Sequence, residues 1–302
     1  MSLYTKHRPK SFDKVIGNKT TIESIENLLS KEKVPHTFLL TGPTGTGKTT
    51  VARIMAAKLE CNGSDYVEVN TSDMRGIDTI RDLIRQSRFK PIEGKSRVWV
   101  IDECHKLTND AQNAFLKLLE EPPAFAFFIL CTTEPEKLIP AIKGRCSTFQ
   151  MNLLNEDEMY SVLKRVVTRE KEKLEKEVYD QIIQDALGHP RNAIQVLEQV
   201  LSVAPGKRLE IAKKKAEELS NVILLCRELM KPKSWKSFTQ ILNGVKTQDA
   251  ETIRRQVIGY ASAVLLNGEN DQAAIILDSF KEPTYNTGFP GIVFATYSVF
   301  KN

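Results

Sequence analysis

Residues 38–50 read FLLTGPTGTGKTT, and the stretch from Gly42 to Thr49 matches the full pattern GxxxxGK(S/T) of a phosphate-binding loop. An apolar run precedes the glycines, and a helical pattern over residues 50–59 follows them. A strand before the loop and a helix after it are the context that this motif requires. Glycines let backbone N–H groups turn toward phosphate oxygens, and the start of the helix adds a positive dipole end. The stretch therefore predicts an α/β fold that binds a nucleotide.

The same loop predicts a set of ligands for the nucleotide and for a metal ion. Lys48 would reach the β- and γ-phosphates of ATP, and Thr49 would bind Mg²⁺ through its hydroxyl. We therefore expect ATP and Mg²⁺ as cofactors. The loop residues expected to contact the nucleotide are Gly42, Pro43, Thr44, Gly45, Thr46, Gly47, Lys48, Thr49 and Thr50.

Three further apolar runs follow the loop, at residues 66–70, 98–101 and 127–131. Near-continuous apolar strands separated by helical patterns indicate a parallel sheet that is covered on both faces. Asp102 and Glu103 follow the second run, where the carboxyl ends of parallel strands face a nucleotide crevice. Asp102 would hold Mg²⁺, and Glu103 would orient and deprotonate the attacking water. Because nucleotide binding alone does not need Glu103, its presence favours an enzyme that hydrolyses ATP.

Beyond the last apolar run the pattern is helical. Asn155 can cap a helix, and Pro190 suits the first turn of another. The charged run 171–176 is typical of a solvated helical face, and residues 204–207 (APGK) form the best linker candidate. We predict an α/β nucleotide-binding domain at 1–152, a small helical domain at 153–204 and a second helical domain at 205–302.

The composition is ordinary for a soluble globular protein, with 41% hydrophobic and 27% charged residues among 302. A net charge of +5 permits a nucleic-acid partner without requiring one. No apolar run reaches the length of a membrane span, and the first residues lack an apolar signal core, so we expect a cytoplasmic location. The five cysteines lack the spacing of a zinc site, so we expect reduced and mostly buried thiols.

Over about residues 4–200, the order of these motifs resembles that of the AAA+ clamp-loader family. Residues 6–17 (KHRPKSFDKVIG) are similar to the segment that wraps adenine, residues 102–107 (DECHKL) to the acidic box, and residues 113–123 (NAFLKLLEEPP) to the bacterial gamma/tau subunit. The positions that match the adenine segment, and that we expect to contact the nucleotide, are Tyr4, Arg8, Pro9, Val15 and Ile16.

The resemblance also implies residues that act in hydrolysis. Thr132 and Thr133 fall at the first sensor, and Thr133 is the better match. Arg145 falls at the signature arginine, which acts on ATP bound to the neighbouring subunit, although Gly144 replaces the serine of that signature. Arg191 falls at the second sensor, which reads the γ-phosphate from a helical lid. The alternatives are strand-end hydroxyls for the threonines, a surface residue for Arg145, and an ion pair within the lid for Arg191.

Residues 72–81 (SDMRGIDTIR) resemble a clamp-loader segment in which a helix N-terminus follows the phosphates of duplex DNA. Arg75 and Arg81 are the expected DNA contacts, and Lys106 and Gln112 are weaker candidates on a neighbouring helix. The alternative for both arginines is a solvated helix face.

One departure from the bacterial family concerns the segment after Cys61. The chain continues directly with residues 62–65 (NGSD), so the four-cysteine zinc module of bacterial gamma/tau subunits is missing. Together with the compact length, this looks more like a phage, archaeal or eukaryotic-type small subunit. The bacterial character of the core favours a phage origin, for which the expected location is the host cytoplasm.

The resemblance implies an ATP-driven motor subunit that opens a sliding clamp and loads it onto primer–template DNA during replication. The expected partners are copies of the chain and other clamp-loader subunits in a ring or spiral, the sliding clamp, and DNA, with clamp and DNA stimulating ATP hydrolysis. Residues 153–204 would be the lid, and residues 205–302 the collar that holds the ring together. Two alternatives stay open, namely an AAA+ ATPase of branch migration or fork repair, and a non-hydrolysing assembly subunit.

Overall fold

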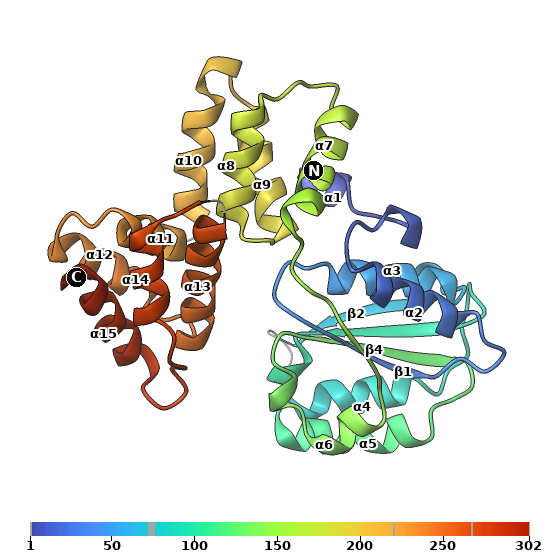
Figure 1. The fold of residues 1–302 in the computed structure, drawn as a ribbon. Helices are drawn as coiled ribbons and strands as arrows, with labels where there is room; N and C mark the ends of the chain where they lie inside the picture. Colours follow the sequence, from blue (N-terminus) through green and yellow to red (C-terminus); the bar gives the residue numbers. More distant parts are fainter. Residues whose placement is uncertain (1, 72–75, 220, 267, 302) are drawn as a thin grey trace. The chain divides into compact units, whose positions relative to one another are not determined.

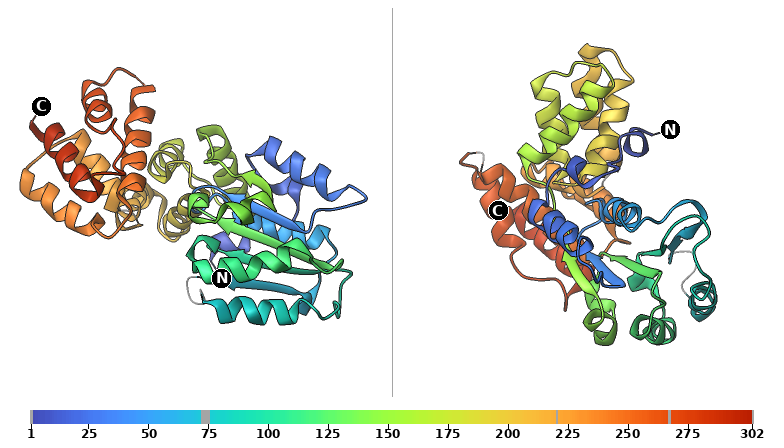
Figure 2. Two further views of the ribbon diagram at one scale, coloured as in Figure 1. Left: turned by 90° about the horizontal axis from the view of Figure 1, so that it is seen from below. Right: turned by 90° about the vertical axis from the view of Figure 1, so that its right-hand side faces the viewer.

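The computed structural model describes residues 2–71, 76–219, 221–266 and 268–301. It forms two compact units, which Figures 1 and 2 show as ribbons. The first unit comprises Leu3–Glu158 together with His189–Arg191. The second comprises Met159–Gly188 and the chain from Asn192 onward.

The first unit is built on a five-stranded parallel sheet with the strand order β2-β3-β4-β1-β5. The strands are β1 (Thr37–Thr41), β2 (Tyr66–Asn70), β3 (Arg97–Asp102), β4 (Ala126–Thr132) and β5 (Ser147–Gln150). This sheet confirms the predicted α/β class, and β1 to β4 fall on the predicted apolar runs. No apolar run marks β5, because this strand pairs only with β1 and its side chains alternate between half-buried and exposed.

Helices cover both faces of this sheet (Figures 1 and 2). One layer contains α2 (Lys19–Leu29) and α3 (Lys48–Lys58), and the other contains α4 (Ile77–Gln86), α5 (Asn109–Glu120) and α6 (Pro140–Gly144). Successive side chains of β1 lie on opposite faces of the sheet. Phe38 packs in the core under α2 and α3, and Leu39 packs in the core under α4 and α5. Burial of each such side chain stabilises the fold by about 1.5–3 kcal/mol. The loop that follows β1 therefore starts from a rigid scaffold.

The second unit contains helices and no strand in the part of the chain that the structure describes. Its helices are α7 (Glu156–Arg169), α8 (Lys176–Ala186), α9 (Pro190–Leu201), α10 (Arg208–Leu219), α11 (Asn221–Met230), α12 (Trp235–Val245), α13 (Ala250–Leu266), α14 (Asp271–Ser279) and α15 (Gly288–Lys301). The first turns of α7 and α9 belong to the first unit. Helices α11 to α15 enclose one core around the buried rings of Phe238 and Phe280.

Two helix starts follow their predicted signals. The Asn155 side-chain oxygen accepts a hydrogen bond from the Glu158 N–H at 2.9 Å, and the Asn155 N–H donates to the Glu158 carboxylate at 3.0 Å. Helix α7 thus begins with a reciprocal cap. Pro190 is the first residue of α9, where its missing N–H costs nothing.

The predicted helical face at residues 171–176 is wrong. Helix α7 ends at Arg169, Lys171 has a left-handed backbone with φ 58°, and α8 begins only at Lys176. A residue with positive φ commonly ends a helix, so most of this charged run lies in a loop.

A single turn of 3-10 helix at Pro205–Lys207 joins α9 to α10, where the sequence predicts a linker. The division into three domains stays a prediction. All five cysteines are free, and four of them are buried. None of the helices within the described ranges is both long and apolar enough to cross a membrane.

Candidate nucleotide site

The phosphate-binding loop connects β1 to α3. Its glycines have positive φ angles of 136° at Gly42, 74° at Gly45 and 100° at Gly47. A Cβ at Gly42 would lie 2.0 Å from the carbonyl oxygen of Met151, so only glycine fits at that position. A backbone of this shape turns successive N–H groups to one side, which is the form of an anion cradle.

Lys48 is the first residue of α3, and only 5% of its surface is exposed. Its ammonium donates hydrogen bonds to the carbonyl oxygens of Gly42 at 2.8 Å and Pro43 at 2.9 Å. Burial lowers the pKa of Lys48, because removal from water disfavours the charged form. A buried cation whose acceptors are neutral carbonyls is well suited to bind an anion.

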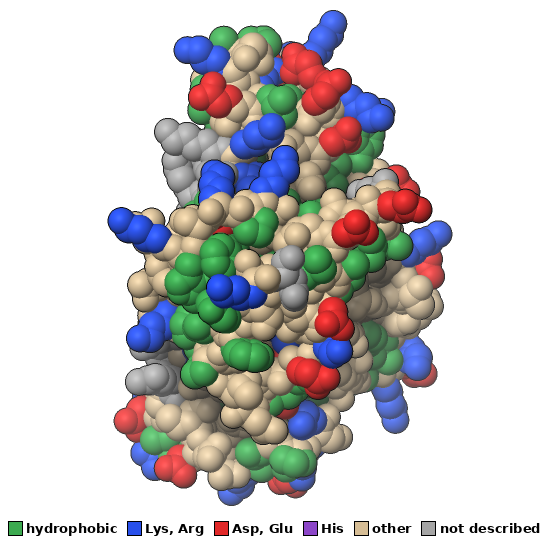
Figure 3. Space-filling model, turned by 60° about the vertical axis from the view of Figure 1, so that its left-hand side comes forward, with side chains coloured by type: hydrophobic (Ala, Val, Ile, Leu, Met, Phe, Trp, Pro, Cys, Tyr) green, Lys and Arg blue, Asp and Glu red, His purple; other side chains and the backbone are tan. Residues whose placement is uncertain are grey.

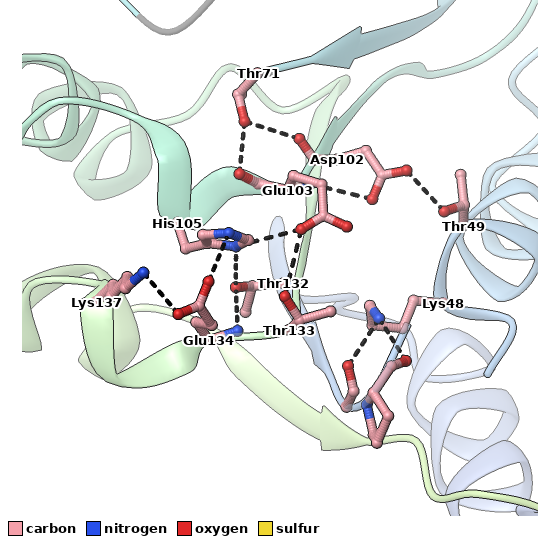
Figure 4. A network of polar contacts seen from close by, with 12 residues as sticks. Lys48, Thr49, Thr71, Asp102, Glu103, His105, Thr132, Thr133, Glu134 and Lys137 are labelled. Atoms are coloured by element: carbon pink, nitrogen blue, oxygen red, sulfur yellow. Dashed lines mark hydrogen bonds and ion pairs between the residues drawn. The ribbon is translucent and has the colours of Figure 1, made fainter. Parts of the chain in front are cut away.

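The structure brings Thr49 and Asp102 together. The Thr49 hydroxyl donates to the Asp102 carboxylate at 2.9 Å, and the other carboxylate oxygen accepts from the Glu103 N–H at 3.1 Å (Figure 4). Asp102 is the last residue of β3, so its carboxylate lies at the carboxyl edge of the sheet. A hydroxyl and a carboxylate in contact are the protein ligands that Mg²⁺ takes beside nucleotide phosphates.

Glu103 follows Asp102 in a constrained turn. Its backbone is left-handed with φ 53°, and its carbonyl oxygen accepts from the Thr71 hydroxyl at 2.6 Å. The Glu103 carboxylate lies 3.4 Å from the Thr133 hydroxyl, which donates to it. Strain of this kind needs a surrounding structure that holds it, and it is common at functional sites. Thr133, rather than the fully buried Thr132, thus turns its hydroxyl toward Glu103 (Figure 4).

His105 is a neighbour of Glu103 that the motifs do not single out. It belongs to the 3-10 turn Cys104–Lys106, and its Nδ1 lies 3.4 Å from the Glu103 carboxylate. Its Nε2 lies 3.0 Å from the carboxylate of Glu134, which follows β4. A lone histidine after an acidic pair carries no signal of such a contact. The contact arises because β3 and β4 are adjacent in the sheet.

Arg191 and Arg8 enclose the ring of Tyr4. The guanidinium carbon of Arg8 lies 5.1 Å from the ring centroid, and that of Arg191 lies 5.0 Å from it. Arg191 also donates to the Tyr4 hydroxyl at 3.2 Å. The buried Nε atoms of both arginines have no hydrogen-bond partner among the described residues. Burial acts to raise the pKa of Tyr4, but the hydrogen bond from Arg191 and the charges of both arginines outweigh it, so the pKa lies below its usual value.

Residues 189–191 also contact the loop directly. His189 Nδ1 lies 2.8 Å from the Thr44 carbonyl oxygen, and a Cβ at Gly45 would lie 3.2 Å from the Arg191 Cβ. Arg191 therefore belongs to the surroundings of the loop, as the resemblance implies for a second sensor. Of the other adenine-segment positions, Val15 packs against the core under α2 and α3, and Pro9 and Ile16 are half-buried.

Arg145 lies elsewhere, at the end of α6. Its side chain donates to the Ala141 carbonyl oxygen at 3.0 Å and pairs with the Glu120 carboxylate at the end of α5. The side chain is 36% exposed. In this chain its guanidinium is thus occupied by neighbours of its own unit and not by the loop around Lys48.

The residues that we expect to contact DNA differ in their exposure. Arg81 is exposed on α4 and pairs with Asp78 at 3.1 Å, while Arg75 lies outside the described residues. Lys106 is exposed. The prediction that Gln112, the other weaker candidate, contacts DNA is wrong, because only 1% of its surface is exposed. Its amide bonds to the backbone of Leu107, Lys137 and Ile139.

One exposed surface was not expected from the motifs. Phe89 and Ile92, in the loop after α4, are 63% and 78% exposed. The buried carboxylate of Asp65 fixes this loop, because it accepts from the N–H groups of Ile92, Glu93 and Gly94 at 2.7–3.0 Å. Two large apolar side chains on an anchored loop form a candidate protein contact.

Two family models match parts of this chain, and proteins of known name are similar to it. A family model described as "DNA polymerase III, delta subunit" matches residues 60–155, and one described as "Sigma-54 interaction domain" matches residues 15–94. The DNA polymerase III subunit gamma/tau of Mycobacterium tuberculosis is 33% identical over 227 residues, or 68% of this chain, but this chain spans only 39% of that protein. The replication factor C small subunit of Methanococcus vannielii is 32% identical over 282 residues, or 92% of this chain and 83% of the relative.

Solved structures show the same fold. A variant of the RuvB protein of Thermotoga maritima has a TM-score of 0.63 and 19% identity, and the match covers 85% of this chain and 91% of RuvB. A DNA polymerase III gamma subunit-related protein of the same organism has a TM-score of 0.51 and 19% identity, and the match covers 92% of this chain and 98% of that protein. With a relative that is 32% identical over most of both chains, this chain belongs to the AAA+ clamp-loader family that includes replication factor C small subunits and DNA polymerase III gamma/tau.

Proposed function

We propose that this chain is an ATP-hydrolysing motor subunit of a clamp loader, which opens a sliding clamp and places it on primer–template DNA. The observation that carries the proposal is the contact of Thr49 with Asp102 beside Glu103, at the end of a complete phosphate-binding loop. The family supports the replicative role, since its members are named as DNA polymerase III and replication factor C subunits. The likeness to RuvB, at 19% identity, supports only a common fold.

Features of the chain itself fit ATP and Mg²⁺. The positive φ angles of the loop glycines suit a cradle for an anion, and the buried Lys48 ammonium contacts neutral carbonyl oxygens of the same loop. The Nε atoms of Arg8 and Arg191, which have no acceptor among the described residues, add donors that suit an anionic ligand. Thr49 and Asp102 would hold Mg²⁺, which when bound neutralises charge on the β- and γ-phosphate oxygens.

Glu103 is the group suited to accept a proton from the attacking water. Its carboxylate stands one residue beyond Asp102, and the Thr133 hydroxyl that donates to it limits its rotation. Positive charge at the γ-phosphate would come from Lys48 and Arg191 of the same chain and from Arg145 of a neighbouring subunit. The presence of Glu103 argues against the alternative of a non-hydrolysing assembly subunit.

The proposed partners are further clamp-loader subunits, the sliding clamp and DNA. The exposed Phe89 and Ile92 offer apolar side chains to the clamp, and Asp65 holds the backbone of Ile92 in place. Arg81, which is exposed on α4, would follow DNA phosphates together with Arg75, without reading bases. Stimulation of hydrolysis by clamp and DNA, and a cytoplasmic location, belong to the same proposal.

The test compares Lys48→Ala and Glu103→Gln with the intact chain. Lys48→Ala should lose tight ATP binding, while Glu103→Gln should bind ATP normally and lose turnover by roughly 10²–10⁴-fold, as expected when a general base is removed. Glu121→Gln, which changes an exposed glutamate after α5, is the matched control and should hydrolyse ATP normally. Clamp loading is measured as clamp retained on circular primed DNA. Turnover in Glu103→Gln close to that of the control would contradict the proposed base.

A further inference from the structure

His105 links the Glu103 carboxylate to the turn that follows β4. Only 5% of the His105 side chain is exposed. Its Nδ1 lies 3.0 Å from the Thr132 hydroxyl and 3.4 Å from the Glu103 carboxylate. Its Nε2 lies 3.0 Å from the Glu134 carboxylate on the opposite side of the ring (Figure 4). The ring is therefore placed between two carboxylates that come from different strand ends.

A neutral ring carries one proton, and the nearer carboxylate decides its position, because Nε2 lies 3.0 Å from Glu134 whereas Nδ1 lies 3.4 Å from Glu103. We therefore assign the N–H donor to Nε2. The Thr132 hydroxyl oxygen already accepts from the Glu134 N–H at 3.0 Å, and its own hydrogen is thus available to Nδ1. Burial lowers the pKa of His105, which favours the neutral ring. Neutral His105 then donates to Glu134 and accepts from Thr132.

The position of the ring proton determines what the Glu103 carboxylate contacts. The Nδ1 beside its carboxylate is an acceptor, so the ring blocks one side of the carboxylate without donating a hydrogen bond to it. The hydroxyl of Thr133, at 3.4 Å, is the donor on that oxygen. Glu103 thus keeps its ability to accept a proton, while the ring and the hydroxyl restrict its orientation. The other end of the ring is held by Glu134, which in turn pairs with Lys137 at 2.6 Å.

We propose that His105 is a positioning residue for Glu103, and that through Glu134 it makes the orientation of Glu103 depend on the turn after β4. This inference rests on the proposed function, because it assumes that Glu103 acts in ATP hydrolysis. A small displacement of a reacting group can cost about 100-fold in rate, so loss of the ring should lower kcat by roughly 10- to 100-fold. The affinity for ATP should not change, because the ring contacts the ends of β3 and β4 rather than the phosphate-binding loop.

The experiment measures kcat, KM and ATP affinity for variants of the full chain. His105→Leu keeps an apolar side chain of moderate size but removes both polar links, and it should lower kcat by roughly 10- to 100-fold with KM and ATP affinity unchanged. His105→Asn can keep an acceptor near Thr132, and His105→Gln can keep a donor near Glu134, so each should recover part of the lost rate. A His105→Leu protein with normal kcat would overturn the proposal. So would a loss of kcat accompanied by an equal loss of ATP affinity, since that pattern indicates a merely structural role.

Glu134→Ala tests the outer link without the risk of unfolding, because the Glu134 side chain is 35% exposed. It should lower kcat by roughly 3- to 10-fold with unchanged ATP affinity, since it removes the acceptor that orients the ring. Glu136→Ala, an exposed glutamate in the same turn, is the control and should have normal kcat. Equal rates for Glu134→Ala and Glu136→Ala would overturn the link to Glu134. If Glu103→Gln itself retains turnover, the proposed function fails; if only the His105 and Glu134 variants are normal, the positioning alone fails.

Discussion

The sheet edge of the first unit and the end of the second unit both bury charged groups, but the two regions satisfy them differently. In the second unit, Glu251 accepts hydrogen bonds from Arg254 at 2.6 and 2.9 Å, from Arg255 at 3.1 Å, and from the N–H and hydroxyl of Thr284 at 3.0 and 3.1 Å. At the sheet edge, Lys48 instead contacts carbonyl oxygens of its own loop.

The difference separates charged groups that are paired within the fold from charged groups that are suited to bind a ligand. Hydrogen bonds from Arg254 lower the pKa of Glu251 to about 2, so the residues around Glu251 stabilise its charged carboxylate without any ligand. Burial lowers the pKa of Lys48, and the Nε atoms of Arg8 and Arg191 find no acceptor in the described residues. Substitutions at the sheet edge should therefore change activity at constant stability, whereas substitutions around Glu251 should change stability at constant activity per folded molecule.

The largest expected effect concerns Arg145. Arginine fingers contribute roughly 10³–10⁵-fold to phosphoryl-transfer rates, so Arg145→Ala should nearly abolish ATP hydrolysis while the chain still binds ATP. Lys143→Ala, in the same helix α6, is the control and should retain turnover. Turnover is measured as the ATPase rate, and ATP affinity is measured by equilibrium binding. To act on a neighbour's nucleotide, Arg145 would have to exchange its contact with Glu120 for that nucleotide.

Action between subunits is tested by mixing Arg145→Ala protein with Lys48→Ala protein. In a mixed ring, some interfaces combine an intact phosphate-binding loop with an intact arginine, and activity should partly return. No recovery in a mixture that is shown to co-assemble would mean that Arg145 acts within its own chain or only structurally.

The next effect is on stability. Glu251→Ala leaves the Arg254 guanidinium, whose side chain is only 12% exposed, without its carboxylate, and should lower the free energy of unfolding by about 3 kcal/mol. Asp278→Ala breaks the exposed pair of Asp278 with Lys281, whose side chains are 75% and 62% exposed, and should cost less than about 1 kcal/mol. Urea unfolding measures both. Equal losses in the two variants would contradict the contrast between the regions.

Lowering the pH should have a smaller effect on the free energy of unfolding. The folded-state pKa of Glu251 is depressed from 4.5 to about 2, so its contribution to stability is complete above pH 4.5 and is lost as the pH falls toward 2. Glu251→Gln removes this titration and should flatten the decline of unfolding free energy as the pH falls below 4.5. A decline as steep in Glu251→Gln as in the intact chain would assign the acid sensitivity to other carboxylates.

Sequence patterns were sufficient for local features and for the meeting of Thr49 with Asp102, but they did not predict other contacts between distant segments. The phosphate-binding loop, the four strands β1 to β4 and the cap at Asn155 depend on neighbouring residues, and the structure has all of them. The contact of Tyr4 with Arg191 joins residues 187 positions apart. The burial of Gln112 could not be predicted either, since glutamine is usually exposed and its amide is satisfied here by three backbone groups.

The smallest expected effect concerns DNA. Arg81 is exposed on α4, and a phosphate contact releases counterions, so Arg81→Ala should flatten the dependence of log affinity on log salt by about 0.9 on duplex DNA. The double variant with Arg75→Ala should flatten it by about twice as much, without a change in sequence preference, because phosphates carry no base information. Arg85→Ala, one turn further along α4, is the control. It removes the same charge from the same helix but lies beyond residues 72–81, the segment expected to follow DNA, so it should leave the slope unchanged. An unaltered slope in the double variant would leave Arg81 as part of a solvated helix face, held by its pair with Asp78.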